Sequence, residues 1–300
     1  MSAFESIRCV TFTIFDLVAS KDAFVKFLSY RSVHEGSVSQ QQADLWHSPS
    51  STGLPCCLLQ PASGENVFIR LIEARSPPAY APLKHYGWNA AELHVQDVYS
   101  LAKRLEDSPF RIIGGPRDLL DNDAVVAMQV LGPGNELLYL TQISDVGMQA
   151  TYGKAETDVG RVFIAVLGSS NLLASCEFYG KLTEQLTQAR ALNIRALANA
   201  HGLDPLGSHF EISSAVFSQP FRIEMDSYPA SATPKPCLKG ALPPGLSMLT
   251  VTVPSTMAGQ LDLLDPVLTG PDEPPYFGQT TGLILGPDGE HLEVIINNPA

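Results

Sequence analysis

The chain has 300 residues, of which 45% are hydrophobic and 17% charged, so it can bury a substantial core and is not a disordered protein. Its 31 acidic and 19 basic side chains give a net charge of −12, which repels nucleic acid and anionic lipid surfaces. No apolar run approaches the roughly 18 residues of a membrane span, and the first residues lack the pattern of a secretory signal. Five cysteines without a CxxC pair favour a reduced, cytoplasmic protein.

The predicted elements form four similar units, each with a strand, a helix and two or three further strands. Apolar runs with β-branched residues predict strands at residues 10–15, 56–60, 66–73, 90–95, 124–130, 136–142, 162–167, 210–217, 221–226, 248–253, 282–285 and 292–296. Helical periodicity predicts helices around 23–28, over 98–105, over 172–187 and around 258–264.

The second half of the chain repeats the first. Three landmarks recur in the same order at nearly one offset, which indicates an internal duplication. They are LGPGNE from Leu131 and LGPDGE from Leu285, LVAS from Leu17 and LLAS from Leu172, and the proline-rich stretches 76–82 and 228–236. We therefore expect two domains, 1–145 and 160–300, each a pair of strand–helix–strand modules, with the polar, aperiodic segment 144–159 between them.

Four segments resemble one known family: TIFDLVAS, ELHVQDVYSLAKRL, CEFYGKL and especially GPDGEHLEV. They are similar to the glyoxalase, bleomycin-resistance and extradiol-dioxygenase group, the vicinal oxygen chelate superfamily, over nearly the whole chain. The resemblance implies an α+β fold of tandem duplicated βαβββ modules, four in all, forming two half-open barrels around small-molecule cavities. Its members include isomerases, lyases, ring-cleaving dioxygenases and drug-binding proteins, so the fold alone does not decide the chemistry.

The resemblance also implies where a metal would be held: by a His near the start of a module's first strand and a Glu near the end of its last. Each of the four modules has one such position in its first strand, the first-strand place, and one in its last strand, the last-strand place. The first-strand places hold Cys9, Ala90, Ile164 and Met248, and the last-strand places hold Arg70, Leu138, Glu224 and Glu293. A catalytic ion takes three or more ligands, and neither half assembles them. We expect no metal cofactor. Fe, Mn, Zn or Ni on displaced ligands stays an alternative, since a two-residue slip would recruit His85, His94 or His209.

Glu92 and His94 are the candidate catalytic residues. Strand alternation turns both toward the same face as Ala90, roughly 7 Å apart. Partial burial would raise the pKa of the carboxyl and lower that of the imidazole, moving both toward neutral pH. We expect Glu92 to act as the base and His94 as the proton donor or second base. Alternatively they interact through water or with Arg70, or they face solvent.

Four further residues are candidates for substrate binding. Arg70 stands in an apolar strand and needs an anion, either a substrate carboxylate or enolate, or an internal partner such as Glu92 or Glu73. Cys9 is either a thiolate nucleophile or, as we favour, an inert buried thiol. The remaining candidates are Glu224 and Glu293, which form a carboxylate pair across one cavity or are exposed remnants of the duplication.

These assignments predict an enzyme of metal-independent acid/base chemistry: a lyase, isomerase or cyclase that removes a proton next to a carbonyl of an apolar or aromatic metabolite. One alternative is a metal-dependent dioxygenase or glyoxalase with displaced ligands, and another is a non-catalytic binding or resistance protein. The expected partner is a small-molecule substrate, without nucleic acid or membrane, and the chain is a monomer or a homodimer.

Overall fold

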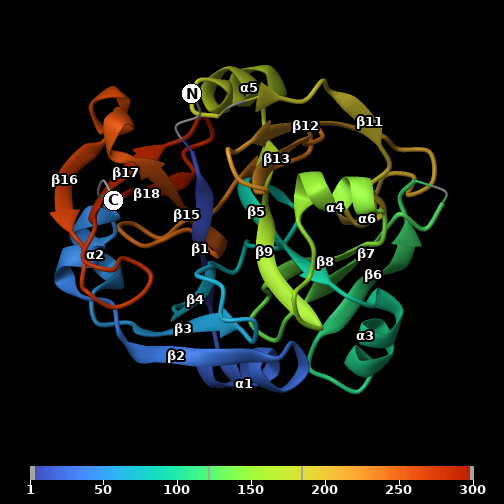
Figure 1. The fold of residues 1–300 in the computed structure, drawn as a ribbon, viewed down its shortest axis with the longest axis horizontal. Coiled ribbons are helices and arrows are strands. Elements are labelled where there is room, and N and C mark those ends of the chain that lie inside the picture. The colour runs from blue at the N-terminus through green and yellow to red at the C-terminus, as the bar shows by residue number, and fades with distance from the viewer. Residues whose placement is uncertain (1–3, 121, 184, 298–300) are drawn as a thin grey trace.

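The computed structural model describes residues 4–120, 122–183 and 185–297 (Figure 1). It contains four consecutive modules that each begin with a long buried strand. The first module consists of β1 (Ser6–Ile14), α1 (Leu17–Phe27), β2 (Tyr30–Ser37), α2 (Gln40–Leu45), the 3₁₀ helix η1 (Pro49–Ser51), β3 (Pro55–Pro61) and β4 (Phe68–Glu73). The second consists of β5 (His85–Val95), α3 (Val98–Leu105), β6 (Arg111–Asp118), β7 (Val125–Leu131) and β8 (Leu137–Ile143), and is followed by α4 (Val146–Tyr152).

The second half repeats this order with more irregular connections. The third module consists of β9 (Val159–Ser169), α5 (Leu172–Gly180), β10 (Gln185–Leu186), β11 (Arg190–Leu192), α6 (Arg195–Ala200), β12 (Phe210–Val216) and β13 (Arg222–Ser227), and is followed by β14 (Thr233–Pro234). The fourth consists of β15 (Gly245–Pro254), the 3₁₀ helix η2 (Ser255–Gln260), β16 (Leu264–Thr269), β17 (Thr280–Leu285) and β18 (His291–Asn297). The predicted α+β fold of four duplicated modules is confirmed.

A side-chain cap starts the helix of each of the first three modules. Asp16, Asp97 and Asn171 follow the first strands and accept hydrogen bonds from backbone N–H groups of the first helical turn. The fourth module has Pro254 at this position and no side-chain cap. The helix expected around 258–264 is accordingly a short 3₁₀ turn that ends earlier.

Two other predicted boundaries differ from the structure. The helix expected over 172–187 ends at Gly180, because the chain then turns back to pair β10 with β12. The segment 144–159, expected to be an aperiodic linker, contains α4, which starts at an Asp145 cap and ends at Gly153 with a positive φ of 82°.

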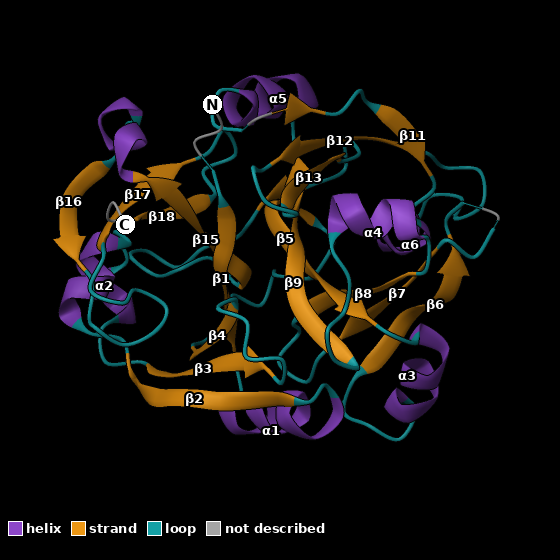
Figure 2. Ribbon diagram, viewed as in Figure 1, coloured by secondary structure: helices purple, strands orange, loops and turns teal. Residues whose placement is uncertain are grey.

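The sheets combine modules across the two halves. One sheet, the first sheet, has the order β16-β17-β18-β15-β1-β4-β3-β2, and the second sheet has the order β10-β12-β13-β9-β5-β8-β7-β6. They lie side by side, with α1, α3 and α5 at the periphery (Figure 2). The first sheet therefore joins modules one and four, and the second joins modules two and three. Domains 1–145 and 160–300 do not correspond to the two sheets, because each sheet takes one module from each half.

Strand alternation separates the core from the cavities. On β5, Ala91 and Leu93 belong to the main apolar core, whereas Ala90 packs in a smaller cluster inside the second sheet. On β1, Val10 belongs to the main core and Cys9 to a small inner cluster. Each first strand thus presents alternate side chains to one cavity. Within the described ranges, no helix is long and apolar enough to cross a membrane.

Candidate functional site

Strand register identifies four equivalent positions, two in each sheet. In each module one residue of the first strand lies beside one residue of the parallel last strand. The pairs are Thr11 with Arg70, Glu92 with Tyr139, Val166 with Glu224, and Thr250 with Glu293. The last-strand place of the second module is therefore occupied by Tyr139, and our assignment of Leu138 is wrong by one residue. Such a slip exchanges the faces of a strand: Leu138 lies in the main core, and Tyr139 lines a cavity.

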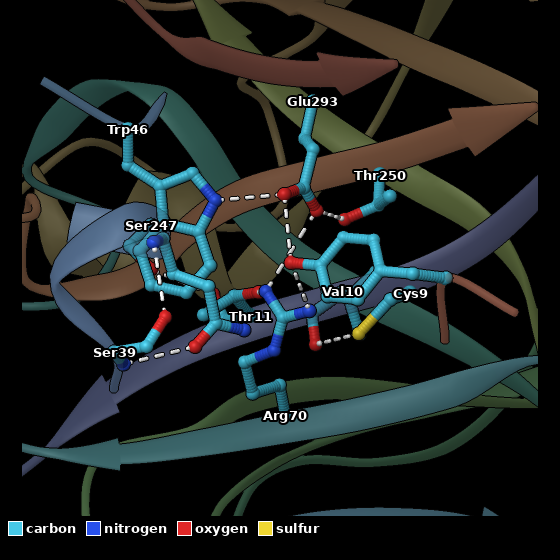
Figure 3. A network of polar contacts seen from close by, with 11 residues as sticks. Cys9, Val10, Thr11, Ser39, Trp46, Arg70, Ser247, Thr250 and Glu293 are labelled. Atoms are coloured by element: carbon cyan, nitrogen blue, oxygen red, sulfur yellow. Dashed lines mark hydrogen bonds and ion pairs between the residues drawn. The ribbon is translucent and has the colours of Figure 1, made fainter. Parts of the chain in front are cut away.

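The first sheet brings Arg70 and Glu293 together, although they are 223 residues apart in the chain (Figure 3). Both side chains are buried, and Arg70 Nη1 lies 3.7 Å from Glu293 Oε2. The carboxylate also accepts hydrogen bonds from Trp46 Nε1 at 2.7 Å, the Tyr276 hydroxyl at 2.9 Å and the Thr250 hydroxyl at 2.7 Å. Glu293 is thus a fully engaged buried carboxylate and not an exposed remnant.

The Arg70 guanidinium is held equally closely. It donates to the Tyr276 hydroxyl at 2.9 Å and to the Thr11 hydroxyl at 3.3 Å, and it lies over the Trp46 ring at 4.9 Å from the centroid. The anion that Arg70 requires is Glu293. The alternatives Glu92 and Glu73 are not its partners: Glu92 belongs to the other sheet, and Glu73 accepts a hydrogen bond from the backbone of Leu17.

Cys9 lies beside this cluster as a buried thiol. Burial raises its pKa to about 11, an effect that the nearby Arg70 charge only partly offsets. The thiol therefore stays protonated at neutral pH, which favours the inert interpretation over a thiolate nucleophile. A cavity of about 380 Å³ adjoins the cluster, with Trp46, Arg70 and Tyr276 in its wall.

The second sheet encloses a cavity of about 400 Å³ with carboxyls in its wall and arginines around it. Glu92 from β5 and Glu224 from β13 both line it. Arg117, Arg190 and Arg195 line it as well; Arg190 and Arg195 are exposed. The cavity thus has an acidic, mostly buried part and a cationic part that reaches solvent.

The two glutamates interact electrostatically. Burial, and then the charge of Glu224, raise the pKa of Glu92 to about 8, although a hydrogen bond from Thr141 at 2.5 Å and the charge of Arg222 oppose the shift. Burial also raises the pKa of Glu224, against the opposing charges of Arg190 and Arg222. The pair therefore retains a proton near neutral pH.

Three further polar side chains lie near the two glutamates, and of these only Tyr139 lines the cavity. Asp226 follows Glu224 at the next inward position of β13, and neither of its carboxyl oxygens has a hydrogen-bond partner among the described residues. The same holds for the hydroxyls of Tyr139 and Tyr228. Burial, and then the charges of Glu224 and Glu92, raise the pKa of Asp226 well above its ordinary value. Asp226 was not among the predicted site residues, although the Glu-x-Asp alternation in a strand could have indicated it.

His94 does not line this cavity. Its ring stacks on Phe163 with centroids 3.6 Å apart, and Nε2 hydrogen-bonds to the backbone carbonyl of Tyr152 at 3.0 Å. Burial, followed by the Arg161 charge, lowers its pKa to about 3. The structure thus brings Glu92 together with Glu224, places Arg70, Cys9 and Glu293 in the other sheet, and leaves His94 packed between elements.

Known structures with the same arrangement identify the fold. Glyoxalase I from Zea mays superposes with a TM-score of 0.58 over 97% of this chain and 92% of that chain, at 13% sequence identity. A Bacillus subtilis protein provisionally named a dioxygenase superposes with a TM-score of 0.61 over 100% of this chain and 87% of that chain, at 11% identity. The chain has the fold of the glyoxalase/bleomycin-resistance/dioxygenase superfamily. No sequence-family model and no curated protein matches it, so this likeness concerns the fold alone.

The metal implied by the superfamily does not fit the residues at the equivalent positions. In the first sheet, the Arg70 guanidinium contacts Glu293, and a second cation beside it would be repelled. In the second sheet, the donors are two carboxyls and the Tyr139 phenol, without an imidazole. Across residues 4–297, apart from 121 and 184, no group of three or more His, Cys, Asp or Glu side chains is arranged to hold an ion.

We therefore expect protein purified without added metal to contain far less than one Fe, Mn, Zn or Ni per chain by elemental analysis. Its melting temperature should not change with a chelator, because no binding free energy is lost. Glu224→Gln serves as the matched variant. A stoichiometric ion in the natural chain that is absent from Glu224→Gln would contradict this expectation and restore the metal-dependent alternative.

Proposed function

We propose that the second-sheet cavity is the active site of an enzyme that transfers a proton next to a carbonyl group, as in a lyase, isomerase or cyclase reaction. The observation that carries the proposal is that the buried Glu92 and the half-buried Glu224 line one cavity. Their surroundings raise the pKa of Glu92 to about 8. A general base works best when its pKa lies near the operating pH. Two carboxyls that cannot both ionise provide one base and one acid.

Glu92 would take the proton from the carbon next to the carbonyl in those molecules in which the single proton retained by the pair resides on Glu224. Glu224 would then donate a hydrogen bond to the carbonyl oxygen as negative charge develops there. Tyr139 lines the same cavity, and its buried hydroxyl has no hydrogen-bond partner among the described residues, so it would be available to donate a second one. Glu224 thus takes the role that we expected for His94, since His94 lies outside this cavity.

The arginines indicate the substrate class. Arg117 donates to the Asn193 side chain at 2.8 Å, and no ion pair within the described part of the chain involves Arg190 or Arg195. Unpaired cations at one cavity of a chain with a net charge of −12 suit an anionic substrate group. With the apolar side chains Leu192 and Ile212 in the wall, the best candidate is a small apolar or aromatic 2-oxo acid.

Hydrogen exchange at carbon tests this function without knowledge of the product. We expect the protein to exchange the C3 protons of aromatic 2-oxo acids with D₂O, as followed by ¹H NMR. Glu92→Gln should slow the exchange by about 10²-fold or more, the usual contribution of a general base. Glu211→Gln, on the exposed face of β12, is the matched control and should exchange at the natural rate.

Two outcomes would reject the proposal. Exchange that is equally fast in Glu92→Gln would show that Glu92 is not the base. Tight binding of the acids without exchange in any variant would favour a binding protein.

A further inference from the structure

A third cavity of about 200 Å³ lies where the two sheets meet, separate from both cavities described above. Trp88 of β5 and Leu246 of β15 contribute to its wall from the two sheets, and Lys235, which directly follows β14, extends into it. Glu290, in the turn between β17 and β18, and His291, the first residue of β18, complete the wall. None of these residues lines the Glu92 cavity.

The Lys235 amine is held by backbone carbonyls alone. Nζ donates to the carbonyl of Trp88 in the second sheet and to that of Leu246 in the first, the latter at 2.6 Å. No ion pair of the described residues includes Lys235. An ammonium group has three N–H donors, so these two acceptors leave the third N–H of this half-buried side chain without an acceptor among the described residues. A neutral amine has two donors, and the same two acceptors satisfy both and leave its lone pair free.

The surroundings favour that neutral form. Burial lowers the pKa of Lys235 to about 7, although the charges of Cys237 and Glu290 act in the opposite direction. Burial lowers the pKa of His291 to about 4, so this neighbour is uncharged at neutral pH. The remaining titratable groups of the cavity wall are Asp288 and Tyr86. Lysines desolvated in this way are the ones that act as nucleophiles toward carbonyl compounds.

We propose that Lys235 is a nucleophilic amine that forms an imine with a small neutral aldehyde or ketone in this third cavity. The nitrogen lone pair adds to the carbonyl carbon, the two N–H protons pass to the oxygen, and that oxygen leaves as water when the C=N bond forms. Amine and carbonyl compound thus give imine and water, without an oxidant or a reductant. The cavity volume, below the roughly 300 Å³ of ordinary ligand pockets, limits the compound to a few carbon atoms.

Reductive trapping in the full-length protein tests this assignment. The protein is treated at pH 7.4 with a limiting amount of acetaldehyde and cyanoborohydride, and ethylated lysines are located by peptide mass spectrometry. Lys239, an exposed lysine four residues further on, is the internal control. We expect Lys235 to be ethylated at least tenfold faster than Lys239.

Lys235→Arg is the matched variant, since arginine keeps N–H donors but is not nucleophilic at neutral pH. It should lose the fast site while remaining folded. Ethylation of Lys239 at a rate equal to or above that of Lys235 would overturn the proposal, and would show that Lys235 serves only to tie the two sheets together.

Discussion

Arg70→Met is expected to lower the free energy of unfolding by roughly 3–5 kcal/mol, the usual effect of removing one partner of a buried ion pair. Arg70 and Glu293 are 4% and 0% exposed. Methionine fills much of the arginine volume, so the loss arises chiefly from leaving the Glu293 carboxylate buried without its cation. Urea unfolding at pH 7 measures the difference.

An exposed ion pair provides the control. Arg104 and Asp158 lie 2.6 Å apart, but both are well exposed, so Arg104→Met should change stability by less than about 1 kcal/mol. The double variant Arg70→Met/Glu293→Gln should recover much of the loss, because no uncompensated charge remains. An Arg70→Met variant as stable as Arg104→Met would show that the buried pair contributes little.

The two sheets have the same strand order but different interiors. In the first sheet, Arg70 and Glu293 take the two last-strand places, and their charges compensate one another. In the second sheet, Tyr139 and Glu224 take these places beside Glu92, and the carboxyls remain without a bonded cation among the described residues. Unpaired buried carboxyls are unfavourable for stability, and we therefore assign the chemistry to the second sheet and a structural role to the polar cluster of the first.

The sequence predicted the modules well because their signals are local. Apolar β-branched runs mark the first strands, and caps such as Asp16 and Asp97 mark where helices begin. The pairing of modules could not be predicted in this way. A first strand such as β1 has apolar residues on both faces, so periodicity does not distinguish β15 from β5 as its neighbour.

The errors at the candidate site have the same origin. Glu92 was found because a carboxyl inside an apolar strand is conspicuous. Its partner Glu224 is 132 residues away and reaches the same cavity only through the pairing of β5 with β9 and of β9 with β13. His94 was predicted to share the face of Glu92, and the alternation holds, since Leu93 and Val95 lie in the main core and His94 stacks on Phe163 of the inner cluster. What periodicity could not show is that Phe163 and the backbone of Tyr152 hold this ring outside the cavity.

Glu92→Gln is expected to stabilise the protein at alkaline pH while it removes the proposed activity. The pKa of Glu92 is about 8 in the folded chain and about 4.3 when unfolded, so the folded state binds more protons between these values. The stability of the natural chain therefore falls as pH rises from about 4.5 to 8. Glutamine has nearly the same shape, can still accept the Thr141 hydrogen bond, and carries no charge.

The natural chain and Glu92→Gln should thus have similar free energies of unfolding at pH 4.5, and the variant should be more stable by about 2 kcal/mol or more at pH 8. Urea unfolding at several pH values gives both curves, and Glu211→Gln, an exposed carboxyl on β12, should follow the natural one. Parallel curves for the natural chain and Glu92→Gln would mean that Glu92 titrates normally, and would remove the physical basis for its role as the base. A Glu92→Gln variant with a higher free energy of unfolding and a slower proton exchange would show that the Glu92 carboxyl supports the activity while it lowers the stability of the folded state.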